Sequence, residues 1–348
     1  MDEETLKKAA RMLISLTRSE SNYLSQIHTI VEVWYKPLKA TPLPIVTEDQ
    51  FQTMLSCIDV IYERTSDFVT RLEAAGSESG VEDDPAVDAA SLSGLEAYVS
   101  ACLSAIEAHG AETGVVSPLL ILYSKYAVDQ VPLGRLIPEL EEDSMIFKGF
   151  MMDAHTHELC RGMEFPELAR FPHRRIREYP ILFRSLSKVL KGTPLGPQAR
   201  GLCDRFQFIS AEVQRNEDSG ARATEIRRSL VFNSELDNLL TDSSLFITDE
   251  GVKVAVNDAP KYTDAVLVLY TDTILLCTSK KADLIVDATM ALATTRVSEL
   301  PPQKKAKHVL AIANNLSGTV YTIVSPSFAT HTSLLRHISS TIDKATTS

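Results

Sequence analysis

The sequence predicts two units in series: an elongated all-α helical bundle, followed by a small antiparallel β-sandwich or barrel that one C-terminal helix caps. Three observations support this fold class. Apolar residues recur at helical spacing up to about residue 230. Strand alternation then replaces the helical period, and an amphipathic helix ends the chain. The 348 residues suffice for two or three domains, and we place the boundary between 1–228 and 229–348.

The helical unit begins with a helix expected over about residues 6–35, which the stretch "YKPLKATPLP" ends. A second helix follows Thr47 and Gln50, whose spacing resembles a capping box. Residues 75–93 are small, acidic and rich in Gly and Ser, so we expect a mobile loop there.

Two longer helices complete this unit. One is expected from about Phe165 to Leu190, with local interruptions at Pro172 and Pro180. The last presents an apolar series at helical spacing: Leu202, Phe206, Ile209 and Val213, which Asn216 extends.

The C-terminal unit has a different period. Residues 265–278 form two short apolar strands about a Thr-Asp turn, and residues 308–324 form a second hairpin. An amphipathic helix is expected after Pro326. Several strands closed by one helix are typical of a small capped barrel or sandwich.

Composition and charge exclude several classes of protein. The net charge of −11 argues against broad nucleic-acid binding, which needs Lys and Arg to neutralise phosphates. The five cysteines are odd in number and scattered, as in reduced cytosolic proteins. No apolar signal core and no run of about 18 apolar residues is present. We expect a cytoplasmic protein, with recruitment to the plasma membrane or the cytoskeleton.

Motifs of catalysis and cofactor binding are missing from the sequence. There is no GxGxxG, GxxxxGK[ST] or GxSxG pattern. His155, His157 and Cys160 in "AHTHELC" could ligate zinc, but Arg161 stands where a second His of HExxH would be. We therefore expect no cofactor, no metal and no covalent chemistry.

One carboxylate in the first helix needs an explanation. Wound at about 100° per residue, Glu20 falls in the middle of an apolar stripe. A carboxylate among core-facing positions is costly to desolvate, so it must be paired, neutralised or exposed. The residues of that stripe are Leu13, Leu16, Leu24, Ile27, Val31 and Leu38.

Four segments resemble a known family. "LTRSESNYLSQIHTIVEVWYKPL" resembles the first signature of Dbl-homology (DH) domains, which are exchange factors for Rho-family GTPases. "FPHRRIREYPILFRSL" (171–186) resembles the third signature, "SPLLILYSKY" (117–126) the middle one, and "VQRNE" (213–217) the end of the last helix. A pleckstrin-homology (PH) domain usually follows a DH domain, which is the order already derived.

The resemblance implies a site for a small GTPase. Glu20 matches the family glutamate that lies on an exposed groove and bonds switch I, with Leu16 and Leu24 supplying apolar contact. Asn216 matches the asparagine that contacts switch II. The alternatives are an internal salt bridge between Glu20 and a nearby arginine, and a helix-end cap for Asn216.

Three positions depart from the family pattern. Phe171 replaces the lysine of the third signature, Arg174 replaces glutamine, and Glu178 stands where arginine is common. Loss of a cation that contacts switch II would lower activity or change the preferred GTPase. Arg174 or Arg175 could substitute for that cation, so we count Phe171, Arg174 and Arg175 among the contact residues.

The C-terminal unit offers only weak lipid contacts. Tight phosphoinositide binders of the PH family cluster Lys and Arg in the first strands, whereas here only Lys253 and Lys261 lie there. Lys280 and Lys281 add a second basic spot, and each lysine is worth about 1 kcal/mol at an anionic surface. A phosphoinositide membrane is therefore expected as a weak partner.

These features predict a guanine-nucleotide exchange factor that binds both switches of a Rho-family GTPase and promotes GDP release. Two alternatives remain: a scaffold that binds GTPase without exchange, which Phe171 favours, and a lipid-recruited adaptor. The central expectation is that Glu20 faces outward.

Overall fold

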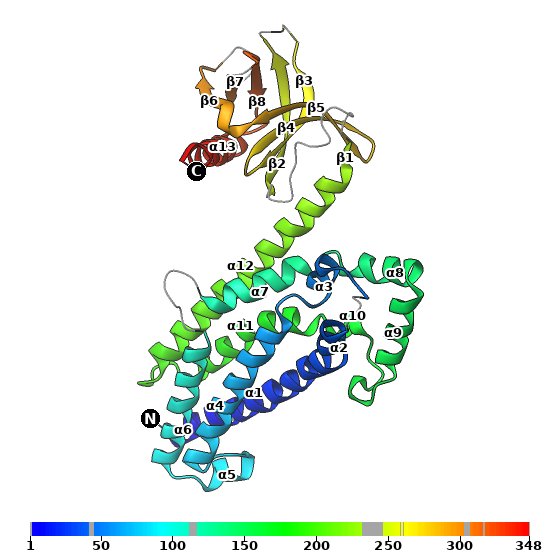
Figure 1. Ribbon diagram of the computed structural model, residues 1–348. Coiled ribbons are helices and arrows are strands. Elements are labelled where there is room, and N and C mark those ends of the chain that lie inside the picture. The colour runs from blue at the N-terminus through cyan, green and yellow to red at the C-terminus, as the bar shows by residue number, and fades with distance from the viewer. Residues whose placement is uncertain are drawn as a thin grey trace. The chain divides into compact units, whose positions relative to one another are not determined.

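The computed structural model describes residues 2–41, 45–110, 117–231, 246–257, 259, 261–302, 307–315 and 317–347 (Figure 1). The chain divides into two compact units, Met1–Gly220 and Ala221–Ser348. This division lies eight residues before the boundary expected from the sequence, because the end of a long helix packs with the second unit.

The described residues of the first unit form helices and their connections, with no strand, and the last helix continues into the second unit. In chain order its helices are α1 (Glu3–Ile30), η1 (Val31–Tyr35), α2 (Lys36–Ala40), α3 (Glu48–Leu55), α4 (Ile58–Ser79), α5 (Asp84–Ala89), α6 (Leu92–His109), α7 (Pro118–Asp129), α8 (Leu133–Asp143), α9 (Met145–His155), η2 (Glu158–Cys160), α10 (Phe165–Leu168), α11 (Phe171–Val189) and α12 (Gly196–Ser229). The predicted all-α bundle is confirmed.

Local signals in the sequence set several helix ends. Asp2 caps α1 by accepting a hydrogen bond from the Thr5 amide at 2.8 Å. Thr47 and Gln50 form the predicted capping box of α3. The first helix continues past the expected end at residue 35, through one π-helical turn (η1) into α2.

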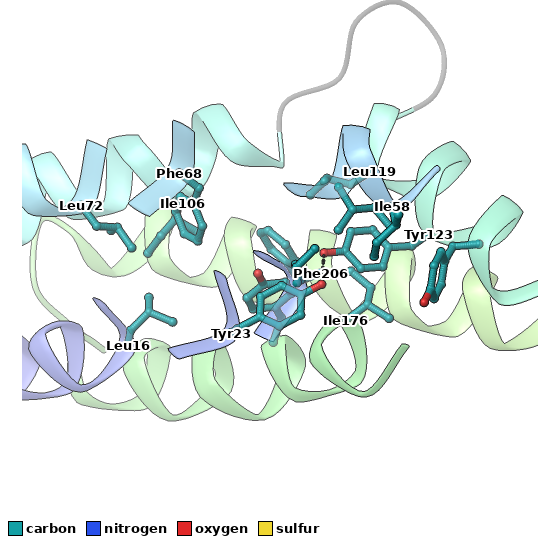
Figure 2. Close-up of a cluster of buried hydrophobic side chains, with 14 of the residues drawn as sticks. Leu16, Tyr23, Ile58, Phe68, Leu72, Ile106, Leu119, Tyr123, Ile176 and Phe206 are labelled. Atoms are coloured by element: carbon teal, nitrogen blue, oxygen red, sulfur yellow. Dashed lines mark hydrogen bonds between the residues drawn. The ribbon is translucent and has the colours of Figure 1, made fainter. Parts of the chain in front are cut away.

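Helices α1, α4, α6, α7, α11 and α12 contribute to one hydrophobic core, part of which Figure 2 shows. Phe206 of α12 packs on Phe183 and Tyr179 of α11, with ring centroids 4.6 and 5.1 Å apart. Trp34, the only tryptophan, is 1% exposed and lies 5.2 Å from the ring of Phe165. The core therefore holds α1 against the helices that carry the other signature segments.

The stretch 75–93 was expected to be a loop, and this expectation was wrong. α4 continues to Ser79, α5 follows, and α6 begins at Leu92. Asp83 caps α5 through the Ala86 amide at 2.8 Å. Gly76 is buried, and a Cβ there would lie 3.3 Å from the Val81 carbonyl oxygen. The small residues thus permit close packing between backbones.

The second unit contains one eight-stranded sheet and a C-terminal helix. Its strand order is β1-β5-β4-β3-β2-β8-β7-β6, antiparallel except for the β1–β5 pair. The elements are β1 (Leu230–Val231), β2 (Phe246–Val256), β3 (Thr263–Tyr270), β4 (Thr273–Lys280), β5 (Asp283–Ala291), η3 (Leu292–Thr294), β6 (Thr295–Leu300), β7 (Val309–Asn314), β8 (Val320–Val324) and α13 (Phe328–Thr347). Both predicted hairpins and the predicted final helix are confirmed.

Alternation along β3 gives the sheet two apolar faces. Leu267 and Leu269 pack in the cluster that includes Leu334 of α13. Val268 packs in a second cluster with Ile226, which belongs to the last turns of α12. Successive side chains on a strand point to opposite faces, so the sheet is covered by α13 on one face and by the end of α12 on the other.

Among the described residues, no helix is both long enough and apolar enough to cross a membrane.

Candidate functional site

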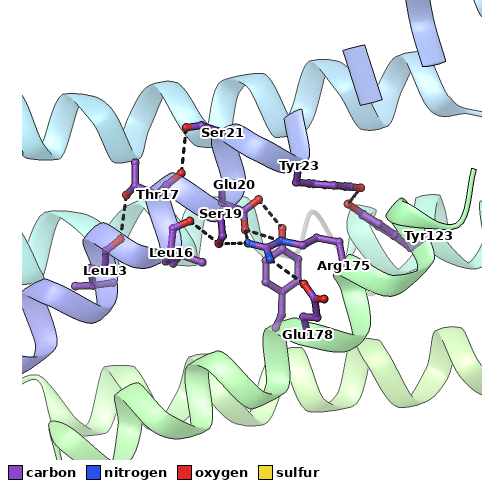
Figure 3. Close-up of polar contacts among 11 residues, drawn as sticks. Leu13, Leu16, Thr17, Ser19, Glu20, Ser21, Tyr23, Tyr123, Arg175 and Glu178 are labelled. Atoms are coloured by element: carbon purple, nitrogen blue, oxygen red, sulfur yellow. Dashed lines mark hydrogen bonds and ion pairs between the residues drawn. The ribbon is translucent and has the colours of Figure 1, made fainter. Parts of the chain in front are cut away.

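The Glu20 side chain lies inside the helical unit, so the expectation that it faces outward was wrong. Its side chain is completely buried. Helix α11, which carries the third signature segment, packs opposite Glu20 and contributes Arg175 (Figure 3). The alternative stated above, an internal salt bridge with an arginine, describes the structure correctly.

Arg175 holds the Glu20 carboxylate through a forked contact. Its Nη2 and Nε atoms donate to Glu20 Oε1 at 2.6 and 3.1 Å. The Tyr179 hydroxyl donates to Glu20 Oε2 at 3.2 Å. Arg175 also donates to Ser19 Oγ at 2.7 Å and to Glu178 Oε2 at 2.9 Å. One guanidinium therefore connects a buried carboxylate to two residues at the surface.

Burial and pairing act in opposite directions on this ion pair. Burial raises the pKa of Glu20 above its usual value, and Arg175 opposes the rise without cancelling it. Burial is the largest single influence on Arg175 and lowers its pKa, but Glu20, Tyr179 and Glu178 together raise the pKa by more, so the net shift is upward. The guanidinium thus keeps its charge, and the stability of the pair depends on its close geometry.

Three tyrosines surround the ion pair. The Arg175 guanidinium carbon lies 5.2 Å from the centre of the Tyr179 ring and 5.9 Å from that of Tyr23. The Tyr23 and Tyr123 hydroxyls are hydrogen-bonded at 3.1 Å, which links α1 to α7. Burial raises the pKa of all three phenols, so they stay neutral.

A groove of about 190 Å³ lies over this network, between α1 and α11. Phe171 and Arg174 line it, and the Arg174 guanidinium lies 5.9 Å from the centre of the Phe171 ring. Arg174 is largely exposed and pairs with Glu178 at 3.0 Å. The other lining residues are Ser19, Asn22, Tyr23, Gln26, Arg175 and Glu178.

The end of the fourth signature segment lies beside α11. Glu217 of α12 contacts His173 at 2.9 Å and Arg177 at 2.8 Å. Its neighbour Asn216 is exposed, and the Asn216 amide donates to Ser124 Oγ of α7 at 2.9 Å. α12 continues to Ser229, so the alternative that Asn216 caps a helix end was wrong. Signature segments from α1, α7, α11 and α12 therefore meet in one region.

The remaining predicted contact residues differ in how far they are exposed. Leu16 is buried at 4% exposure and Arg175 at 6%, so neither is an open contact residue here, contrary to expectation. Leu24 is half-buried. No polar role was predicted from the sequence for Ser19, Tyr179 or the Tyr23–Tyr123 pair. Tyr23 and Tyr179 stand at matching positions of the first and third signature segments, and that match could have identified them.

The four lysines predicted as lipid contacts lie near one end of the sheet, because the β2–β3 and β4–β5 connections are at the same end of an antiparallel meander. Lys261 belongs to the first connection, Lys280 is the last residue of β4, and Lys281 begins the second connection. Lys253 lies 3.7 Å from Asp264, which offsets part of its charge. The basic character of this end is weak.

The described residues contain no group of three or more His, Cys, Asp or Glu side chains that could hold a metal ion. The site offers hydrogen-bond donors, charges and a shallow groove, which suit recognition of another protein surface.

The fold and site define a class: a DH-type helical bundle followed by a PH-type sheet with its capping helix. Residues 13–207 match the family described as "RhoGEF domain". This match covers more than half of the chain, and the chain belongs to the RhoGEF (DH) family.

Solved structures of DH/PH domains share this fold. The DH/PH domains of PDZ-RhoGEF, solved in a complex with GTP-γ-S activated RhoA, have a TM-score of 0.68 and 14% identity, covering 99% of this chain and 96% of that one. The DH/PH domain of human ARHGEF11, solved with human RhoA and its inhibitor, has a TM-score of 0.60 and 14% identity, with coverage of 97% and 94%. Identities this low show the fold alone.

The curated relative is the myosin-M heavy chain of Dictyostelium discoideum, which is 18% identical over 284 residues. The match covers 80% of this chain and 15% of the relative. The chain thus spans a small part of that relative's length.

Proposed function

We propose that this chain binds a Rho-family GTPase over the groove between α1 and α11, with Asn216 of α12 at the edge of the contact, and that it promotes GDP release. The observation that carries the proposal is the meeting of the signature segments around one groove, in a chain of the RhoGEF family. Related DH/PH proteins have been solved in complexes with RhoA, which makes RhoA the first GTPase to test.

The proposed mechanism makes and breaks no covalent bond. A surface that binds the switch loops in a different arrangement must weaken nucleotide and metal binding reciprocally. A thousandfold faster release needs about 4 kcal/mol of differential stabilisation. One charge-assisted contact supplies only about 1.5–3 kcal/mol, so apolar groove residues and a standard-sized interface must contribute.

The buried ion pair changes the role that we propose for Glu20. In the unbound chain its carboxylate positions Arg175, and Arg175 in turn orients Ser19 and Glu178 at the rim of the groove. The exposed groups at the groove, Arg174 above all, make the first contacts with the GTPase. A direct contact between Glu20 and switch I would require the Arg175 pair to open.

A second candidate is a DH-type scaffold that binds GTPase and leaves exchange unchanged. The enclosure of Glu20 by Arg175 favours it, because the carboxylate that would act on switch I is occupied within the chain. Phe171 at the usual lysine position favours it as well.

One pair of measurements separates the two candidates. Release of fluorescent GDP is followed for RhoA and other Rho-family GTPases with the full chain, and binding of each nucleotide-free GTPase is measured in parallel. Acceleration for at least one GTPase supports exchange. Binding without acceleration supports the scaffold, and neither binding nor acceleration rejects both.

A charge-matched pair of variants tests the location of the site. Arg174→Glu reverses an exposed charge at the groove. Arg200→Glu makes the same change at a position that is 81% exposed and about 24 Å from Asn216 along α12, at about 1.5 Å per residue. We expect the first variant to weaken GTPase binding at least about tenfold and the second to leave it unchanged.

A further inference from the structure

Helix α9 is apolar on two opposite faces. Its inner face buries Phe147 and Met151 in the core of the helical unit. Its outer face exposes Met145, Ile146 and Met152, whose exposures are 79%, 72% and 64%. Figure 1 shows α9 beside α8, at the end of the helical unit away from α5.

The three exposed residues lie on the side of α9 opposite Phe147 and Met151. At about 100° per residue, Met145 and Met152 point within about 20° of each other, two turns apart, and Ile146 lies next to Met145. Exposed apolar side chains gathered on one side of a helix mark a candidate interaction surface. No part of the chain that the structure describes covers this face.

Acidic residues border the outer face. Glu141, Glu142 and Asp143 occupy the last turn of α8, and Asp153 follows Met152. Within the described residues none of these four carboxylates has an ion pair, and Lys148 is the one cation among them on α9. Carboxylates in a last turn lie at the negative end of the helix dipole, so the folding of α8 does not explain them.

We propose that the outer face of α9 is a docking surface for a basic amphipathic helix of a partner protein. Apolar side chains of that helix would pack on Met145, Ile146 and Met152, and its Lys or Arg residues would pair with the acidic border. Methionine side chains are flexible and polarisable, which suits a surface that accepts a helix. None of these residues lines the α1–α11 groove, so the inference goes beyond the proposed function.

The probe is a synthetic helical peptide of about 18 residues, built from Leu on one face and Lys on the other. A control peptide carries Glu at every Lys position. The full chain is labelled at its methionine methyl groups, and methyl resonances are followed by NMR during titration. Met145 and Met152 should shift with the Lys peptide, whereas the fully buried Met54 should not. The Glu peptide should bind at least about tenfold more weakly.

A matched pair of variants locates the contact. Ile146→Ser should weaken Lys-peptide binding at least about tenfold, because central apolar contacts dominate such interfaces. Ile121→Ser makes the same change at a residue of α7 that is 60% exposed, and binding should be unchanged. Equal weakening in both variants, no weakening in either, or equal binding of the two peptides would overturn the proposal.

The proposal and the proposed function fail separately. Ile146→Ser should leave GTPase binding and any exchange activity at the level of the unmodified chain. If nucleotide-free RhoA shifts Met145 and Met152, and Ile146→Ser weakens RhoA binding, the face belongs to the GTPase interface and a separate helical partner is rejected. Failure of the peptide to bind, with GTPase binding intact, rejects the docking surface alone.

Discussion

Replacing Arg175 by Met removes the cation that neutralises Glu20 while keeping most of the side-chain volume. The carboxylate then keeps only the 3.2 Å hydrogen bond from Tyr179. Folding at pH 7 would require Glu20 to take up a proton, because a bare buried charge costs more. From its ordinary pKa of 4.5, protonation at pH 7 costs 2.5 units, or about 3.4 kcal/mol. This agrees with the roughly 3–5 kcal/mol typical of a broken buried pair.

The variant should also acquire a pH dependence of known sign. Its folded state retains a proton that the unfolded chain loses above pH 4.5, so its free energy of unfolding should fall as pH rises, by about 1.4 kcal/mol per unit relative to the unmodified chain. The double variant Glu20→Gln with Arg175→Met should recover most of the loss and show no such slope.

The assay is urea unfolding of the full chain followed by tryptophan fluorescence. Trp34 is the only tryptophan and is buried in the helical unit, so the signal reports that unit alone. If the free energy of unfolding of Arg175→Met at pH 7 lies within about 0.5 kcal/mol of that of the unmodified chain, the buried pair does not stabilise the fold as described, because surface substitutions have effects of that size. A large loss of stability without the pH dependence would contradict the protonation of Glu20 in the variant.

Three further predictions concern other parts of the chain. Burial lowers the pKa of His109 to about 3, so below pH 6.5 the unfolded chain binds a proton that the folded chain does not. The free energy of unfolding of the helical unit should therefore fall by about 1.4 kcal/mol per pH unit as pH falls from 6.5 towards 5. His109→Phe should remove that slope in the same fluorescence assay. Phe171→Lys should accelerate fluorescent-GDP release about tenfold or more if a switch II cation is missing, and an unchanged rate would contradict this. Lys280→Glu with Lys281→Glu should reduce sedimentation with anionic liposomes by roughly fivefold per lysine, whereas equal sedimentation would exclude these residues.

Much of the fold could be predicted because its signals are local. The hairpins at 265–278 and 308–324 alternate at period two, and capping residues such as Thr47 satisfy amides three residues away. The stretch 75–93 could not be predicted from composition. A small residue suits position 76 because the backbone at Val81, just after the end of α4, folds back close to it, and composition alone cannot separate that reason from mobility.

The site was only partly predictable, for a related reason. The sequence shows a carboxylate on an apolar stripe, but the partner of Glu20 is 155 residues away in the chain. Whether the carboxylate faces solvent or Arg175 depends on how α11 packs against α1, which helical periodicity cannot give. The family resemblance favoured exposure, whereas the packing buries the side chain, and the cost of desolvating it is offset by the forked contact.

We propose that a Rho-family GTPase binds over the groove between α1 and α11, with the middle of α12 at the edge of the contact. The most direct measurement is hydrogen–deuterium exchange of the full chain with and without nucleotide-free RhoA. We expect slower exchange in residues 16–27, 171–184 and 213–217, and little change in 145–152. Protection of 145–152 with no effect on the three signature segments would contradict it.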